Sequence, residues 1–215
     1  GMSKAYELIG RSLLDSFGLD LRMHQVDQAV RRGQVTIFGE VREIDWMVPH
    51  YATDDGKVHM TIRALVVESE GRRIVVDTCL GNDKQGRRIP HWNERQGRFL
   101  EDMRETGFPP ETIDTVLCTH LHVDHVGWNT RLLDGRWVPT FPRARYLLPR
   151  ADEAYYAEHA KGMYAESILP VIEAGQAEFV EGGHALSDQI VLMPTSGHTE
   201  GHVSVWIRSG GAEAV

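Results

Sequence analysis

Four side chains that can bind a metal ion lie within six consecutive positions, directly after a short apolar segment. His120 and His122 are two residues apart. At the end of a strand this spacing points both imidazoles to the same side. Asp124 and His125 follow where the chain turns, so they can face a second, adjacent point. Because borderline cations such as zinc accept nitrogen and carboxylate oxygen together, the segment predicts a metal centre.

A second histidine segment, residues 194–202, also follows a short apolar stretch, residues 190–193. Glycine precedes and closely follows His198, as expected where backbone passes close to a site. A distant histidine that completes a three-nitrogen set with a local pair is a familiar metal site, so His198 is a predicted ligand. We expect His202, at the start of the next apolar run, to have a hydrogen-bonding or purely structural role rather than to bind metal.

With these motifs the chain resembles the metallo-β-lactamase superfamily. The resemblance is carried by His-Leu-His-Val-Asp-His at 120–125 with Gly127 behind it, by Ser-Gly-His at 196–198, and by Val-Val-Asp-Thr at 75–78. It covers residues 35–215 in order. It implies an α/β fold, namely an αββα sandwich of two mixed sheets with the metal centre at one edge between them.

The resemblance also implies a role for each site residue. It implies two divalent metal ions, with zinc expected and manganese or iron as alternatives. One ion would be held by His120, His122 and His198, and the second by Asp124 and His125. Asp77 would orient the ligands by hydrogen bonds, as metal sites generally require. The alternative for Asp77 is an acid that forms the turn at a strand end.

The chain departs from the family's pattern after His202. The family supplies a metal-bridging Asp one strand beyond the Gly-His motif, and usually a last His further on. Here no Asp follows Asp188, no His follows His202, and Glu213 is the only acid near the expected place. Residues 203–215 resemble a hairpin that is cut in its second strand. We therefore expect a C-terminally truncated form whose second half is incomplete.

The segments that must position these residues alternate between strand and helix patterns. Strand patterns occur at 35–41, and at 60–68 and 73–77 as a hairpin that turns at Gly71. The predicted order therefore places mixed rather than purely parallel sheets in the domain. The further elements are a helix from Phe99 to Gly107, strands at 113–117, 146–148, 179–180, 190–193 and 203–207, helices at 151–160 and 164–174, and a turn-rich segment at 129–142.

Residues 1–33 have the spacing of amphipathic helices and form a predicted N-terminal extension before the hydrolase domain at 34–215. The extension covers part of the core or contacts a partner subunit, as in a homodimer, and the sequence leaves both open.

Composition narrows the class of protein. The chain has 41% hydrophobic and 25% charged residues, which is the ordinary balance of a globular protein. A net charge of −8 disfavours nucleic acid as a partner. No apolar run approaches the ~20 residues of a membrane span, and the first ten residues lack a signal-peptide core. Cys79 and Cys118 lie in apolar stretches and are expected to be reduced, buried and unbound to metal, so we predict a cytoplasmic protein.

These features predict a hydrolase in which a metal-bound hydroxide attacks an electrophilic substrate. Asp124 is the nearest group for proton transfer and is the predicted catalytic residue. A small molecule with an apolar portion fits the aromatic-rich surroundings, so a lactone or ester ranks first. A phosphotriester or thioester is the alternative, and a metal-binding protein without turnover is the alternative of another class. The residues expected around the pocket are Trp46, Met47, Tyr51, Trp92, Trp128, Trp137 and Phe141.

Overall fold

A computed structural model of the 215-residue chain describes residues 34–37, 40–43 and 61–215. The chain divides into two compact units, Gly1–Thr61 and Ile62–Val215. In the first unit, β1 (Gln34–Ile37) pairs antiparallel with β2 (Glu40–Glu43), so the single strand predicted at 35–41 is two. The predicted helices of residues 1–33, and Trp46, Met47 and Tyr51, lie outside the described residues.

The centre of the second unit is a sheet with the strand order β3-β4-β5-β8-β9 in the described part of the chain. Strand β3 pairs antiparallel with β4, which confirms the predicted hairpin, and the remaining neighbours run parallel. The sheet is therefore mixed, as expected. Its strands are β3 (Leu65–Ser69), β4 (Arg72–Val76), β5 (Thr115–Leu117), β8 (Arg145–Pro149) and β9 (Ala177–Val180).

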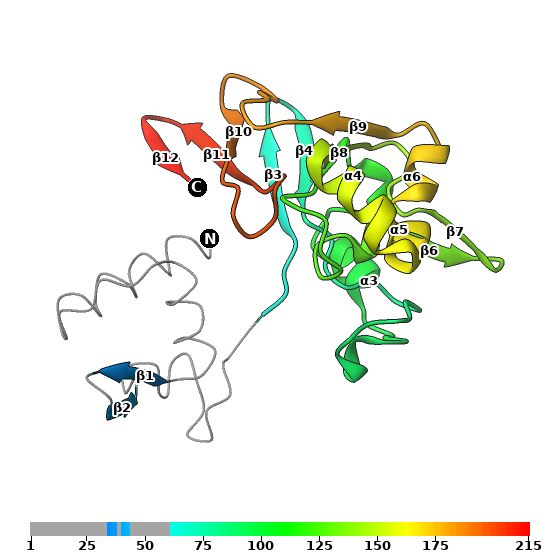
Figure 1. The fold of residues 1–215 in the computed structure, drawn as a ribbon. Helices are drawn as coiled ribbons and strands as arrows, with labels where there is room; N and C mark the ends of the chain where they lie inside the picture. The colour runs from blue at the N-terminus through cyan, green and yellow to red at the C-terminus, as the bar shows by residue number, and fades with distance from the viewer. Residues whose placement is uncertain (1–33, 38–39, 44–60) are drawn as a thin grey trace. The chain divides into compact units, whose positions relative to one another are not determined.

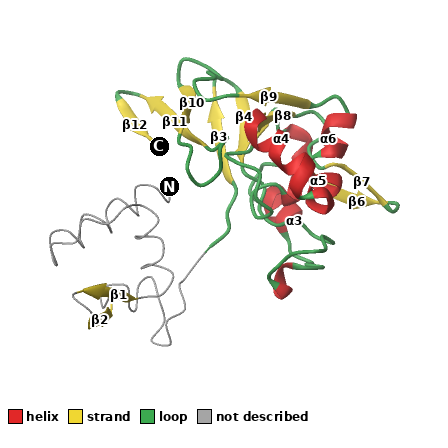
Figure 2. Ribbon diagram, in the orientation of Figure 1, coloured by secondary structure: helices red, strands yellow, loops and turns green. Residues whose placement is uncertain are grey.

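A second sheet packs on one face of the first (Figure 2). Its described strands are β10 (Ile190–Pro194), β11 (Val203–Ser209) and β12 (Ala212–Ala214), and β11 pairs antiparallel with both of the others. The expected mixed pairing is therefore limited to the first sheet. Chain direction reverses after each strand here, so short turns suffice and crossover helices are not needed.

Helices cover the opposite face of the first sheet (Figure 1). They are α3 (Phe99–Glu105), α4 (Arg150–His159), α5 (Lys161–Ser167) and α6 (Leu169–Glu173). The helix predicted at 164–174 is interrupted at Ile168. Pro170 has no N–H to donate to the carbonyl of Glu166, four residues earlier. That carbonyl instead accepts a hydrogen bond of 3.0 Å from Lys84 Nζ.

Alternating residues of the central strands build two separate cores. Ile74 and Val76 face the second sheet, where they pack with Leu192 and Val203. Val75, between them, packs on the helix side with Ile168. Because side chains of a strand alternate between its faces, a strand buried on both sides must be apolar throughout. This explains why β4 ends in Ile-Val-Val before the first acid of the site.

The segment at 129–142 contains a hairpin that the sequence did not indicate. Strand β6 (Thr130–Leu133) pairs antiparallel with β7 (Arg136–Pro139). The remaining short elements are the 3-10 helices η2 (Pro90–Trp92), η3 (Pro110–Thr112) and η4 (Gly127–Asn129).

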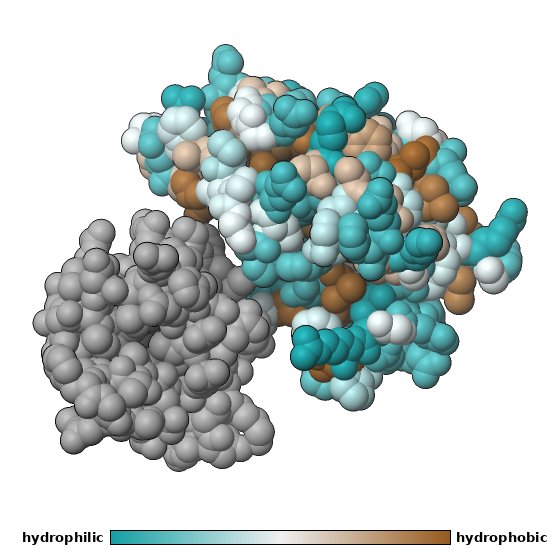
Figure 3. Space-filling view, viewed as in Figure 1, coloured by the Kyte–Doolittle hydropathy of each residue, from teal (hydrophilic) through white to brown (hydrophobic). Residues whose placement is uncertain are grey.

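Figure 3 shows a surface of the second unit on which hydrophilic residues predominate and apolar residues are scattered. None of the described helices has the length and apolarity that crossing a membrane requires.

Lys84 is fully buried beneath the hairpin of β6 and β7. Its Nζ lies 2.6 Å from Thr130 Oγ1 and 3.6 Å from the centre of the Trp137 ring. Nearby, Arg87 and Glu166 form a buried ion pair. Burial lowers the pKa of Lys84 to about 7, against the attraction of Glu166, which raises it.

Gly127 is required by the close approach of two backbone segments. A Cβ at this position would lie 1.9 Å from the carbonyl carbon of Leu80. We expect Gly127→Ala to lower the free energy of unfolding by about 3 kcal/mol or more, because backbone on both sides must shift. Urea denaturation measures this. Gly162→Ala, where a Cβ meets nothing within 4 Å, is the control and should gain up to about 1 kcal/mol in helix α5. Equal stability of the two variants would contradict the close approach.

The buried lysine predicts a pH dependence of stability. The pKa of Lys84 falls from 10.5 to about 7 on folding, so between these values the unfolded chain binds one more proton than the folded chain. The free energy of unfolding should therefore rise with pH in this window, by up to about 1.4 kcal/mol per pH unit. The part of the stability that depends on neutral Lys84 is lost as the pH falls towards 7. Lys84→Met should abolish this slope, measured by urea titration at several pH values. The exposed Lys161→Met should keep it, and parallel curves for wild type and Lys84→Met would refute the assignment.

Candidate metal centre

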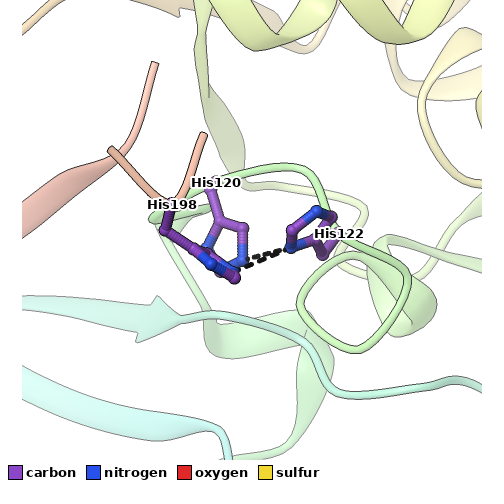
Figure 4. Close-up of side chains that lie close together, drawn as sticks. All are labelled: His120, His122 and His198. Carbon is purple, nitrogen blue, oxygen red and sulfur yellow. Dashed lines mark hydrogen bonds between the residues drawn. The ribbon is translucent and has the colours of Figure 1, made fainter. Parts of the chain in front are cut away.

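The ends of two strands bring three predicted ligands together. His120 and His122 follow β5 in the first sheet, and His198 lies between β10 and β11 in the second. One ligand nitrogen from each of the three histidines lies within 4.8 Å of the others. The loops are joined directly, because the Val203 N–H donates to the Thr119 carbonyl at 2.9 Å. Figure 4 shows the three rings converging from these two loops.

His122 stands at the centre of the cluster. Its Nδ1 lies 3.0 Å from His120 Nε2 and 3.0 Å from His198 Nε2 (Figure 4). Burial decreases along the set, from His120, which is 2% exposed, through half-buried His122 to exposed His198. The cluster therefore has a closed inner side and an open side from which solvent or a small molecule can approach.

The inner imidazoles are held in their neutral form. Burial lowers the pKa of His120, and the neighbouring His125, His122 and His198 lower it further. Burial also lowers the pKa of His122, again reinforced by His198. A neutral imidazole keeps one nitrogen lone pair free, which is the form that ligates a metal. The site is therefore prepared for a cation without first losing protons from these two rings.

This donor set fits a divalent metal. Unprotonated nitrogens that face one another at 3.0 Å repel through their lone pairs unless a proton or a cation lies between them. Nitrogens bound to zinc at about 2.0–2.1 Å in a tetrahedron lie a little over 3 Å apart. The observed spacing is thus close to that of ligands around one ion. The assignment of these three residues as ligands remains a prediction.

Asp77 lies where β4 ends and contacts both ends of the histidine segment at 119–125. Its carboxylate accepts hydrogen bonds from the Thr119 N–H at 2.8 Å and from the Thr119 hydroxyl at 2.9 Å. It also lies 2.8 Å from His125 Nδ1. Thr119 Oγ1 in turn lies 3.1 Å from His120 Nδ1. Both rings can then donate Nδ1–H towards Asp77, directly or through Thr119, which leaves each Nε2 free.

Asp77 holds this place with a strained backbone. Its φ is +58°, a conformation that a residue with a side chain adopts at some energetic cost. Its N–H donates to the Leu117 carbonyl at 2.8 Å, and the next N–H donates to the His125 carbonyl at 2.7 Å. These bonds offset the strain and fix the carboxylate beneath the motif. The contacts go beyond those of a residue that only forms a turn.

Asp124 and His125 form a second pair of possible ligands beside the cluster. Asp124 Oδ2 lies 3.5 Å from His125 Nε2, and the His125 ring centre lies 3.9 Å from that of His120. Burial acts to lower the pKa of His125, but hydrogen bonds and charge from Asp124 and Asp77 prevail and raise it to about 9. Burial opposes ionisation of Asp124, yet His125 holds its pKa below the usual value. The carboxylates of Asp124 and Asp77 therefore attract positive charge strongly at this point.

His202 lies beside the cluster but outside the three-nitrogen set. Its ring centre is 5.0 Å from that of His120, and its Nδ1 lies 2.8 Å from Thr195 Oγ1. Cys79 and Cys118 are both free. Burial raises the pKa of Cys79 to about 11 and that of Cys118 still higher, so neither supplies a thiolate at neutral pH. Cys118 is buried as expected, whereas Cys79 is only half-buried.

Two of the aromatic residues expected around the pocket belong to the core. Phe141 is fully buried in the helix-side core, and Trp128 is 7% exposed and stacks on Phe99 at 5.4 Å. The apolar segments around them bury large rings wherever they face inward, so proximity in sequence did not place them at the site. Tyr156, which we did not predict, lies with its ring centre 5.9 Å from that of His122. Its only sequence signal is its place in the helix predicted at 151–160.

The sequence profile of the Metallo-beta-lactamase superfamily matches residues 61–213. Among curated proteins, the chain is similar to an N-acyl homoserine lactonase from Bacillus sp, with 28% identity over 156 residues. The alignment covers 67% of this chain and 57% of the relative. The chain spans 57 to 63% of the length of the curated relatives it matches.

Solved structures share the fold. Hydrolase AbOPH of the beta lactamase superfamily aligns with a TM-score of 0.62 and 21% identity, over 90% of this chain and 62% of that one. AidC, a dizinc quorum-quenching lactonase in complex with the product N-hexnoyl-L-homoserine, aligns with a TM-score of 0.56 and 20% identity, over 71% of this chain and 54% of that one. These matches confirm the predicted fold.

The buried member of the cluster provides the sharpest test of metal binding. We expect His120→Ala to remove most of the bound metal, because the variant loses the ligand that the fold shields best from water. Metal per chain after dialysis, measured by atomic emission, reports this directly. His91→Ala, an exposed histidine outside the cluster, should bind as much metal as the wild type. Full occupancy in His120→Ala would show that the cluster is not the metal site.

Proposed function

Because the chain belongs to the metallo-beta-lactamase superfamily, we propose that it is a metal-dependent hydrolase that opens lactones with an apolar acyl portion. The observation that supports this most is the convergence of three imidazoles from two sheets, with the two inner rings held neutral. Such a set attracts a divalent cation without first being deprotonated.

In this proposal His120, His122 and His198 hold one divalent ion, and Asp124 and His125 hold a second. Zinc is the expected metal, because nitrogen with carboxylate oxygen is a set that zinc favours and because the structural neighbour AidC is a dizinc enzyme. Bound there, the metals would supply Lewis acidity and lower the pKa of a coordinated water.

The residues around the metals have separate tasks in the proposed reaction. Asp77 would hold the Nδ1 proton of His125 and, through the Thr119 hydroxyl, that of His120, which would leave both Nε2 atoms free to bind the metals. Asp124 is ionised near neutral pH and stands beside His125, where it could accept a proton from the attacking water and return it to the leaving oxygen. The exposed side at His198 admits the substrate, and Tyr156 offers a ring edge beside His122.

The substrate class follows from charge and from the relatives. A net charge of −8 disfavours polyanions at long range, whereas a lactone is neutral. The similar Bacillus proteins are N-acyl homoserine lactonases, whose substrates carry an acyl chain. A phosphotriester or thioester hydrolase is the second candidate, because the same metal chemistry serves those bonds and the neighbour AbOPH is described only as a hydrolase. A cytoplasmic location agrees with the two free cysteines.

A substrate panel tests the proposal. We expect kcat/KM for N-acyl homoserine lactones to rise with acyl chain length and to exceed that for an aryl phosphotriester, a thioester and a β-lactam. Each added methylene that is buried on binding contributes about 0.8 kcal/mol. The protein is loaded with zinc and freed of excess metal before each assay.

His120→Ala is the control that separates the metal centre from contaminating activity, and it should be inactive towards every substrate. Rates that do not rise with chain length, or a lead of more than about tenfold for the phosphotriester or thioester, would refute the lactone assignment. Stoichiometric metal without turnover of any substrate would favour a metal-binding protein that is not an enzyme.

A further inference from the structure

We propose that Asp152 is a positioning residue that locks the loop of His120 and His122 to the loop of His198. The inference rests on the proposed metal site, but it concerns a carboxylate that belongs neither to the three histidines nor to the pair of Asp124 and His125. Asp152 lies in the first turn of α4 and is 2% exposed. A carboxylate is rarely buried so completely unless its oxygens are well occupied by donors.

The donors to Asp152 come from both ligand loops. Its Oδ2 accepts the N–H of Leu121 at 3.1 Å and the hydroxyl of Thr199 at 2.8 Å. Its Oδ1 accepts the N–H of Gly201 at 2.7 Å. Leu121 lies between the two histidines of the first loop, and Thr199 directly follows His198. One side chain thereby fixes backbone on both sides of the cluster, with donors next to each predicted ligand of the first metal.

Gly201 gives independent support for a close fit at this point. A Cβ on Gly201 would lie 2.8 Å from Asp152 Oδ1, 2.9 Å from Asp152 N and 3.0 Å from Pro149 Cβ. The second loop can therefore reach the carboxylate only with a glycine at this position. The contact is built from both sides, by a buried acid on α4 and by a missing side chain on the loop.

The hydrogen bonds of Asp152 help to fix the distance between His122 and His198, which no interaction between neighbours in sequence controls. His122 and His198 are 76 residues apart in sequence and belong to different sheets, yet their nitrogens stand 3.0 Å apart. Apart from the histidines themselves, the loops are joined by the single Val203–Thr119 backbone bond among the described contacts. Asp152 adds three charge-assisted bonds, which are stronger than neutral ones. Preorganised ligands lose less conformational freedom when a metal binds, so affinity should depend on this carboxylate.

The experiment compares graded losses of the lock. Asp152→Ala removes it, Asp152→Asn keeps the shape but replaces an acceptor with a donor, and Thr199→Val removes one donor. Glu153→Gln is the matched control, because Glu153 is the next residue of the same helix and accepts a hydrogen bond from Tyr164 instead. Zinc Kd is measured by chelator competition, ligand geometry by the visible spectrum of the cobalt(II) form, and thermal stability by circular dichroism.

We expect zinc binding to weaken roughly tenfold or more in Asp152→Ala and less in Asp152→Asn and Thr199→Val. The cobalt spectrum should change in all three, whereas Glu153→Gln should match the wild type. If Asp152→Ala fails to fold, the two milder variants decide. Folded Asp152→Asn and Thr199→Val proteins with wild-type zinc affinity and spectrum would overturn the proposal, even if their melting temperatures fall, because Asp152 would then serve stability alone.

Hydrogen exchange keeps this inference separate from the proposed function. In the metal-free protein, the amides of Leu121 and Gly201 should exchange faster in Asp152→Asn than in the wild type and Glu153→Gln. If the wild type binds no zinc, the proposed function fails, and exchange at these two amides still decides whether Asp152 joins the loops. Unchanged exchange at both amides would overturn the lock regardless of metal binding.

Discussion

One imidazole nitrogen of His122 stands within hydrogen-bond distance of a nitrogen of His120 and of a nitrogen of His198, where burial keeps His120 and His122 from taking up a proton. Lone pairs at this separation repel, and the repulsion becomes attraction only when a proton or a cation lies between them. In a metal site of this kind, folding holds the ligands close together against their mutual repulsion before the metal binds. Relief of that repulsion then adds to the free energy of metal binding. Much of the surrounding architecture can be understood as the means of holding these rings together.

The scaffold meets this constraint with strand ends rather than with long loops. His120 and His122 follow β5, Asp77 follows β4, and the backbone bonds between residues 77–81 and 125–128 tie these neighbours closely. Gly127 allows the two segments to approach to a distance that no side chain would tolerate. The second sheet then brings His198 from the opposite side. Strand ends are suited to this task because the packed sheets behind them resist movement.

Buried charge surrounds the site, and each charge is compensated in a different way. Asp77 and Asp152 accept donors from the ligand loops, so their burial is coupled to the geometry of the cluster. Lys84 is instead enclosed by Thr130, the Glu166 carbonyl and the Trp137 ring, away from the proposed ligands. A buried ion without such partners would cost several kcal/mol. The acids therefore support the histidine cluster, whereas the lysine links the loop of residues 81–97 to α5 and β6.

Local sequence by itself determined the two histidine segments predicted to bind metal, the hairpin of β3 and β4, and the mixed character of the central sheet. Each of these depends on residue type and on a period of two or a few positions, which the chain carries without reference to its neighbours. The apolar run before His120 predicted a buried strand because both of its faces had to be covered. The hydrogen bonds of Asp77 were anticipated from the family pattern.

Only the tertiary structure decided which distant groups meet. Asp152 belongs to an ordinary polar helix turn in the sequence, and its importance arises from donors supplied by Leu121, Thr199 and Gly201. The burial of Lys84 and the interruption at Ile168 share one cause, a Glu166 carbonyl freed by Pro170 and then bound by the lysine. Trp128 and Phe141, close to the motif in sequence, turned into the core. Hydrogen bonds and packing join residues that are distant in sequence, so a periodic pattern predicts which face of an element is buried but not which residues contact it.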